Sequence, residues 1–434
     1  MLLTPHRPSN LSETLSKAMR VVDGQTGIIK LLHEPPLAPD GPKIFGCGSL
    51  TSDFASIGIP SGNDISGSTS ELRAQAIAGA VGEAIERYSA AYVPYERVRH
   101  STPRSLGADH VDPERLTFYR DAQYGKPGFP FPRFSDRDAI GWVEGYALPG
   151  LRPVMVPAFA VFQPYVSQVG ERNVTQQITT GLACGNTLEE AIVSGLCEVV
   201  ERDAAMLAWL TRQSPPKLQL DTLPEGRART ILRRFGVLAR HVTVLDVTSD
   251  VDIPAYVAAW DGPMLGERRA IFCSCAKPNA DSAVAGALRE LAQCMMWVES
   301  LLDGGAVPPD PDIEPIEEIQ QHVLWPLRED LREHFAFLLA SDQSVPLRRS
   351  GITAGATPLS AIEFCAGRLA ACSLEAIAVD VTSPDICEVG FRVARVIIPG
   401  AQPLYFGSGL ERISARAAAL RPDADFNLYP HPFP

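Results

Sequence analysis

Two largely apolar stretches of the chain, residues 81–90 and 196–206, carry the same pattern of charged side chains. Each holds two glutamates three residues apart, and an arginine directly follows the second glutamate. These residues are Glu83, Glu86 and Arg87 in the first stretch and Glu198, Glu201 and Arg202 in the second. Carboxylates suit hard cations, and Mg²⁺ typically takes one or two of them together with substrate phosphates. Arginine suits phosphate oxygens.

Residues three and four apart lie on one face of a helix, so each stretch would present its carboxylates together. A buried carboxylate costs several kcal/mol unless it is paired or ligated. One arginine for two glutamates leaves unpaired negative charge on each helix. The alternative is a solvated face whose Glu–Arg pairs contribute only about 0.3–0.5 kcal/mol each. Because the pattern occurs twice on apolar helices, we favour two helices that jointly present Mg²⁺ ligands for a nucleotide.

The periodicity of the chain predicts the elements that position these residues. One long helix is expected over 71–92, and a second begins after Thr187, where Glu190 completes a capping box. Two more helices are expected at 281–305 and 359–375, the former closed by Gly304 and Gly305. Strands are expected at 241–248, 253–262 and 268–277 and in two runs after the fourth helix. This irregular alternation favours a mixed α/β (α+β) fold.

The rest of the chain divides simply. Residues 1–45 are expected to be an irregular segment, because "PPLAPDGP" at 35–42 excludes a helix or a central strand there. Residues 101–170 carry many Pro and Gly and predict small strands and loops. One domain is expected over 46–434, ending in a Pro-rich tail at 430–434.

Composition excludes several classes of protein. The chain has 434 residues, 45% of them apolar, and a net charge of −12, which disfavours a nucleic-acid surface. It shows neither a signal peptide nor an apolar run of about 18 residues, so no membrane contact is expected. Nine scattered cysteines predict reduced thiols and a cytoplasmic protein. A Walker loop, GxGxxG, HExxH and GxSxG are all absent from the sequence.

Three segments resemble the YcaO family. "GLACGNTLEEAIVSGLCEVVERDA" (181–204) is similar to its central signature, "GAVGEAIERYS" (79–89) to its earlier helix, and "NLYPHPFP" to the tail of its azoline-forming members. The likeness extends over roughly 45–434. It implies an ATP-binding fold of mixed sheets and long helices without a Walker loop. It also implies an enzyme, the stand-alone cyclodehydratase of thiazole/oxazole-modified microcin (TOMM) biosynthesis.

The reaction that the resemblance implies uses ATP and Mg²⁺. A Cys, Ser or Thr side chain of a ribosomal precursor peptide attacks the preceding amide carbonyl. The amide oxygen is phosphorylated, and loss of phosphate leaves a thiazoline or oxazoline. Positioning and charge neutralisation are then the protein's part, and no covalent nucleophile is needed.

The resemblance also implies site residues. Its metal ligands are Glu83, Glu86, Glu198 and Glu201. Its nucleotide-binding residues are Arg87, Arg202, Glu190, Gln293 and Thr180, although capping explains Glu190 equally well. Its catalytic tail residues are Pro430, Pro432 and Pro434.

The tail has properties of its own. Alternating prolines fix φ near −65° and make the segment stiff, so docking costs it little entropy. A disordered terminus is the alternative on composition alone. The resemblance implies that the tail delivers the carboxylate of Pro434 to the active site. We expect deletion of 430–434 to stop cyclisation and to change the melting temperature little.

Four residues depart from the family pattern. Gly79 stands where Ser is usual, Thr179 and Thr180 replace Ser-Asn, and Met295 replaces an Arg. The Gly-rich "SGSTSE" (66–71) also lacks a common Lys or Arg. These losses of polar contacts predict weaker or partner-dependent use of ATP, whereas the retained glutamates argue against an inactive scaffold.

Partners follow from the resemblance as well. The chain begins almost directly at the YcaO region, so a separate E1-like protein is expected to bind the leader of the precursor peptide. An FMN-dependent dehydrogenase is expected to oxidise the azolines, and a homodimer is what the family suggests. Two alternatives remain: another YcaO chemistry, which makes a thioamide or an amidine, and a non-catalytic partner subunit.

Overall fold

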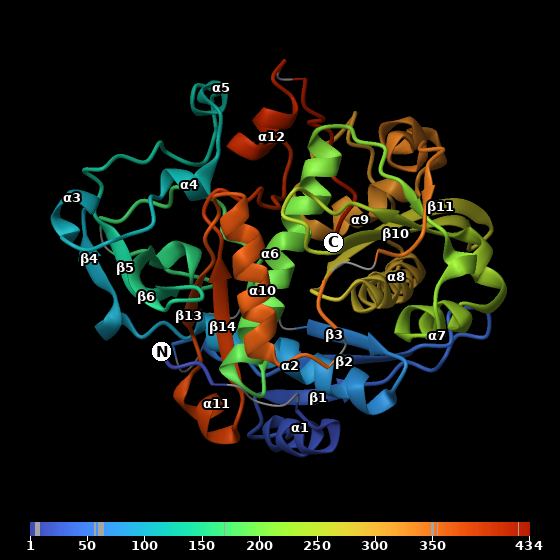
Figure 1. Ribbon diagram of the computed structural model, residues 1–434, viewed down its shortest axis with the longest axis horizontal. Coiled ribbons are helices and arrows are strands. Elements are labelled where there is room, and N and C mark those ends of the chain that lie inside the picture. Colours follow the sequence, from blue (N-terminus) through green and yellow to red (C-terminus); the bar gives the residue numbers. More distant parts are fainter. Residues whose placement is uncertain are drawn as a thin grey trace.

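Three sheets form the frame of the molecule in the computed structural model (Figure 1), which describes residues 1–4, 9–55, 58–59, 65–168, 170–348, 351–353, 355–423 and 425–434. The first has the order β1(Ile29–His33)–β2(Phe45–Thr51)–β3(Ile65–Ser70). The second has the order β11(Glu267–Ala276)–β10(Ala255–Met264)–β9(Val242–Asp246)–β8(Lys217–Leu218)–β12(Ser344–Val345). The third has the order β4(Arg99–Ser101)–β5(Ile140–Ala147)–β13(Ile377–Asp380)–β14(Arg392–Ile397)–β7(Leu182–Gly185), with β6(Arg152–Pro157) beside β5. Only β8 and β12 pair in parallel among the described strands.

Four helices are long: α2(Arg73–Ala91), α6(Leu188–Leu210), α8(Ala280–Asp303) and α10(Pro358–Ala371). The shorter helices are α1(Leu11–Ala18), α3(Pro103–Leu106), α4(Glu114–Thr117), α5(Asp121–Tyr124), α7(Arg227–Arg234), α9(Ile319–Leu324), α11(Pro384–Val389) and α12(Ala415–Leu420).

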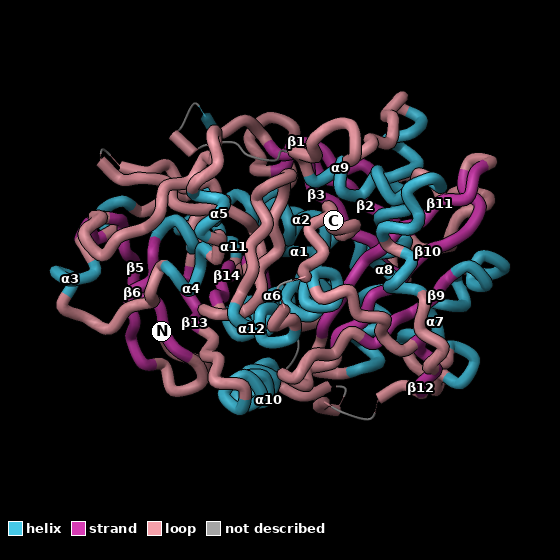
Figure 2. The backbone as a smooth tube through the Cα atoms, turned by 90° about the horizontal axis from the view of Figure 1, so that it is seen from above, coloured by secondary structure: helices cyan, strands magenta, loops and turns pink. Residues whose placement is uncertain are grey.

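Three of the long helices lie where the sheets approach one another. Helix α2 packs on β2 and β3 and reaches β7, while α6 packs between β14 and β7 on one side and β10 and β11 on the other. Helix α8 covers β10 and β11 and touches β3. Seen from above, α2, α6 and α8 surround the point where the chain ends (Figure 2). Side chains on the inner faces of these helices therefore come from segments far apart in sequence.

Helix α6 forms the centre of the largest hydrophobic core. Leu196, Val200 and Trp209 are among its buried side chains, and they pack with residues of β10, β11 and β14. The helix starts as its sequence predicts, since the Thr187 hydroxyl caps it by accepting the N–H of Glu190 at 3.2 Å. The capping box differs in its second half, because the Glu190 carboxylate accepts the N–H of Asn186 rather than that of Thr187.

The expected mixed α+β fold is confirmed, and the predicted long helices and strands appear within a few residues of their expected bounds. Helix α8 ends at Asp303 before Gly304 and Gly305, as predicted. The expectation of a wholly irregular segment over 1–45 is wrong, because it contains α1 and β1. Asn10 caps α1 by accepting the N–H of Ser12, and β1 pairs antiparallel with β2. Strand pairing of this kind is a tertiary effect that local composition does not report.

Within the described part of the chain, no helix is both long and apolar enough to cross a membrane. All nine cysteines are unpaired, as the sequence predicts for reduced thiols.

Candidate active site

A cavity of about 450 Å³ opens among α2, α6, α8, β11 and the end of the chain. All four predicted metal ligands line it, two from each acidic helix: Glu83, Glu86, Glu198 and Glu201. Arg202, Gln293 and Pro434 line it too. Residues predicted from four separate segments of sequence therefore meet in one place.

The first acidic helix presents Glu83 toward the β1–β2–β3 sheet. Its Oε2 accepts the N–H of Gly67 in β3 at 2.8 Å, and its Oε1 pairs with Arg87. Arg87 also donates to the carbonyl oxygen of Ile65 at 2.7 Å. Gln293 of α8 completes this wall by donating to the carbonyl oxygen of Gly67 at 3.1 Å. Arg87 is thus engaged with the protein here and does not line the cavity.

The second acidic helix presents its carboxylates to two strands. Glu198 accepts the N–H of Gly181, just before β7, at 3.1 Å. Glu201 accepts the hydroxyl of Ser274 at 2.8 Å and the N–H of Ala276 at 3.3 Å, both in β11. These bonds orient the carboxylates, and carboxylate oxygens have further lone pairs for other donors or a cation.

Burial makes the four carboxylates reluctant to ionise in the absence of a cation. It raises the pKa of Glu83 and Glu198, and it raises the pKa of Glu201 to about 7. The pKa of Glu86 is raised well above its ordinary value, first by burial and then by the charges of Glu198 and Glu83. Arg202 opposes this effect at Glu198 and Glu201. A divalent cation would remove the mutual repulsion.

The donor set fits Mg²⁺ bound together with phosphate. Among the described residues, no three His, Cys, Asp or Glu side chains converge closely enough to hold a metal alone. The four glutamates therefore form no closed protein cage. Mg²⁺ usually takes only one or two carboxylates and completes its octahedron with water and phosphate oxygens, so hard oxygen donors spread around a cavity suit it.

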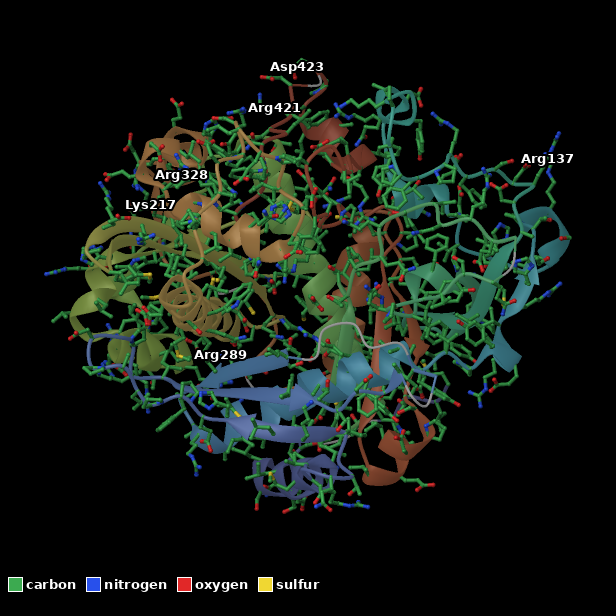
Figure 3. All side chains as sticks on the ribbon, turned by 180° about the vertical axis from the view of Figure 1, so that it is seen from behind. Arg137, Lys217, Arg289, Arg328, Arg421 and Asp423 are labelled. Carbon is green, nitrogen blue, oxygen red and sulfur yellow. The ribbon has the colours of Figure 1, made fainter. Side chains whose placement is uncertain are left out.

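Three cations face the same cavity: Arg202, Lys277 and Arg289. The Nε–H groups of Arg202 and Arg289 are buried and have no hydrogen-bond partner within the described residues. Figure 3 shows Arg289 where α8 approaches the β1–β2–β3 sheet. Unsatisfied guanidinium donors beside buried carboxylates suit a polyanionic ligand such as a triphosphate.

Sequence reasoning missed Lys277, Arg289 and Glu290, all of which line the cavity. A signal existed for the last two, because they precede Gln293 by four and three residues in "LRELAQ" and share its helix face. Lys277 directly follows β11, and only the fold brings it to α6.

Glu190 and Thr180, like Arg87, are predicted nucleotide-binding residues that do not line this cavity. Glu190 accepts the N–H groups of Asn186 and Ser9, at 3.0 and 2.9 Å, at the start of α6. Thr180 lines a neighbouring, mostly apolar pocket with Arg395 and Val199. The cap that the structure shows is the Thr187 hydroxyl, whereas the Glu190 carboxylate accepts the N–H of Asn186. Binding of a nucleotide by Glu190 or Thr180 stays a prediction.

The departures from the family pattern have structural reasons in two places. A Cβ at Gly79 would lie 2.7 Å from the Cβ of Ser68, so a serine at position 79 has no room, and Ser68 supplies a hydroxyl to the same wall. Met295 lies in α8, and its side chain is buried in the hydrophobic core on which this helix packs. A polar contact to a ligand is therefore not available from that position.

The Pro-rich tail is buried and ordered. The indole of Trp209 donates to the carbonyl oxygen of Tyr429 at 3.0 Å, and Phe433 is fully buried in the core around α6. At its end, Arg202 Nη1 donates to an oxygen of Pro434 at 2.6 Å. The tail is therefore packed in the core rather than disordered. Because losing a buried Phe costs about 3–5 kcal/mol, we now expect deletion of 430–434 to lower the melting temperature rather than to leave it nearly unchanged.

Comparisons with known proteins show which family and which solved structures this chain is similar to. The model of a family described as YcaO cyclodehydratase, ATP- and Mg²⁺-binding, matches residues 68–402. An uncharacterised protein of Methanothermobacter thermautotrophicus is 31% identical over 291 residues, which is 66% of this chain and 69% of that protein.

Solved structures share the fold. A heterocyclase in complex with substrate and cofactor matches with a TM-score of 0.76 and 22% identity, over 93% of this chain and 55% of its own. This chain therefore spans about half the length of that heterocyclase. YcaO from Methanopyrus kandleri, bound with AMPPCP and Mg²⁺, matches with a TM-score of 0.64 and 23% identity, over 92% of this chain and 93% of its own.

Proposed function

Because this chain belongs to the YcaO family of ATP- and Mg²⁺-binding cyclodehydratases, we propose that it is a stand-alone enzyme of TOMM biosynthesis that converts Cys, Ser or Thr of a ribosomal precursor peptide to thiazoline or oxazoline. One observation carries the proposal. A single cavity unites four partly buried glutamates, three cations and the end of the Pro-rich tail. Polyanion-binding groups and Pro434 of the tail thus adjoin one space.

The reaction balances as a dehydration coupled to ATP. The substrate thiol or hydroxyl attacks the carbonyl carbon of the preceding amide, and the new ring keeps the amide nitrogen. The former carbonyl oxygen leaves as phosphate, and protons of the nucleophile and of the amide N–H are released. ATP with Mg²⁺ supplies the phosphoryl group that makes this oxygen a good leaving group. The peptide loses one water for each ring.

The residues of the cavity divide this task by their chemistry. The four glutamates would hold Mg²⁺, and Arg202, Lys277 and Arg289 would neutralise phosphate oxygens. The Pro434 carboxylate, held by Arg202, would accept the proton of the attacking thiol or hydroxyl. Pro430 and Pro432 would keep the tail rigid.

The remaining partners belong to the same proposal. A separate E1-like protein would present the leader of the precursor peptide, and an FMN-dependent dehydrogenase would oxidise the azolines to azoles. The enzyme would work in the cytoplasm, where reduced thiols such as its nine unpaired cysteines persist. A homodimer is the expected assembly.

We expect the enzyme to be nearly inactive alone on full-length precursor and to gain orders of magnitude in rate with the E1-like protein. Physically, leader binding raises the effective concentration of the core peptide at the site. The measurement is the mass of the cognate peptide after incubation with Mg-ATP, with and without the partner. Loss of one water per modified residue is expected.

Other outcomes separate the alternatives. Exchange of oxygen for sulfur, with sulfide supplied, would identify a thioamide-forming enzyme instead. Loss of water that leaves every Cys, Ser and Thr unmodified in fragment spectra would identify an amidine. If this protein turns over no ATP, and the peptide is modified only when another subunit is present, the protein is a non-catalytic partner. Equal rates with and without the E1-like protein would overturn the partner requirement.

A further inference from the structure

Two buried imidazoles stack against each other where the tail enters the core. His322 lies in α9, and His431 lies in the tail. Their ring centroids are 4.2 Å apart with an interplanar angle of 25°. Both side chains are almost fully buried. Neither residue is explained by the proposed chemistry, so the question is what the pair does.

The hydrogen bonds of His322 fix its protonation state. Its Nδ1 lies 2.8 Å from the carbonyl oxygen of His431, which can only accept, so Nδ1 carries the proton. Its Nε2 accepts the N–H of Gly407 at 3.3 Å, so Nε2 carries none. His322 is therefore neutral and in one tautomer.

His431 is fixed in the complementary way. Its Nε2 lies 2.6 Å from the carbonyl oxygen of Tyr405 and must donate, while its Nδ1 accepts the N–H of Phe433 at 3.3 Å. This ring is also neutral, in the opposite tautomer. Four backbone groups are thus satisfied by two imidazoles, and each nitrogen has one role.

This arrangement continues directly into the cavity. The residue after Phe433 is Pro434, whose oxygen accepts from Arg202 at 2.6 Å. We propose that the His322–His431 pair is a positioning device that holds the Pro434 carboxylate on Arg202, and that only the doubly neutral pair can do so. This proposal deepens the proposed function, on which its catalytic consequence rests.

Protonation would disable the device. A proton on either ring turns an acceptor nitrogen into a donor that faces a backbone N–H, and charge on both rings would repel across the stack. Arg202 of α6 is the further cation near His431, and the Tyr405 hydroxyl stays neutral because burial raises its pKa. Burial lowers the pKa of His322 to about 4, and burial and then His322 lower that of His431 well below its ordinary value.

The sign of the pH effect follows from these directions. The docked tail binds fewer protons than the released tail, in which His431 would titrate near the ordinary histidine pKa of about 6.5. Docking is therefore complete above about pH 6.5 and weakens as the pH falls toward the pKa of about 4 that His322 has in the docked state.

The test uses His322→Asn, His431→Gln and His431→Ala. The Asn amide can replace the donor that His322 Nδ1 gives to His431, and the Gln amide can replace the donor that His431 gives to Tyr405. We expect His431→Ala to lower kcat for cyclisation at least about tenfold with little change in the KM for ATP. His322→Asn and His431→Gln should have a higher kcat than His431→Ala. In both, the fall of kcat at acid pH should be flatter than in the parent protein, because amides do not titrate.

Hydrogen exchange of the Phe433 amide, measured without substrate, reports docking independently of activity. Exchange should be slow above pH 6.5 and faster in His431→Ala. The control His241→Ala, which removes an imidazole that packs edge-on against Trp260, should leave the exchange unchanged. Unchanged exchange in His431→Ala, or full kcat with a released tail, would overturn the proposal. Slow exchange in a protein that cyclises no peptide would reject the proposed function and keep the docking device.

Discussion

Replacing Glu83, Glu86, Glu198 or Glu201 singly with glutamine is expected to abolish peptide-dependent ATP hydrolysis while the protein stays folded. Each change removes one of the carboxylates that would hold Mg²⁺ in the cavity, and Mg²⁺ in turn would hold the phosphates. Loss of a preorganised electrostatic contact typically costs about 10²–10³-fold in rate. Phosphate release with partner and peptide present measures the effect.

Folding should survive because burial already disfavours the charged form of these side chains. Glutamine keeps the shape of glutamate and can still accept the N–H bonds that Gly67 and Gly181 donate. Melting temperatures should therefore be unchanged or higher. Glu96→Gln, on the exposed turn that follows α2, is the matched control and should turn over normally. Near-normal turnover in two of the four cavity variants would refute a shared site.

Moving the carboxylate of Pro434 is expected to stop cyclisation. Adding one glycine after Pro434, or removing Pro434 alone, displaces the acid from Arg202 and leaves the buried Phe433 in place. We expect peptide cyclisation to fall at least about a hundredfold with a melting temperature close to that of the parent protein. Peptide mass and thermal unfolding are measured on the same samples.

Deletion of all five residues 430–434 is the informative contrast. It should also stop cyclisation, but it should lower the melting temperature because Phe433 and His431 leave a cavity in the core. Full cyclisation by the glycine-extended protein would show that the position of the carboxylate does not matter. The tail would then serve packing alone.

The acidic pairs could be predicted from sequence because helix periodicity is local. Spacing alone places Glu83 with Glu86 and Glu198 with Glu201, and the fold then brings the two pairs into one cavity. The capping of α6 by Thr187 is local as well and was predicted for the same reason. Membership of the YcaO family is confirmed by the family model.

Long-range partners could not be predicted. Lys277 reaches the cavity only because β11 packs on α6, and His322 meets His431 across 109 residues of sequence. Composition assigns a Pro-rich terminus to disorder, yet burial of Phe433 in the core outweighs that tendency. Strand β1 depends in the same way on its partner β2.

Calorimetric titration with a non-hydrolysable ATP analogue, with and without Mg²⁺, tests the central claim most directly. Burial raises the pKa of Glu201 to about 7, so part of this group is protonated near neutral pH before a cation binds. Mg²⁺ requires the carboxylate, and binding should therefore release protons and tighten as the pH rises through about 7. The account predicts Mg²⁺-dependent binding that Glu201→Gln makes weak and insensitive to pH in this range. Equal affinity with and without Mg²⁺, or in the parent protein and Glu201→Gln, would contradict it.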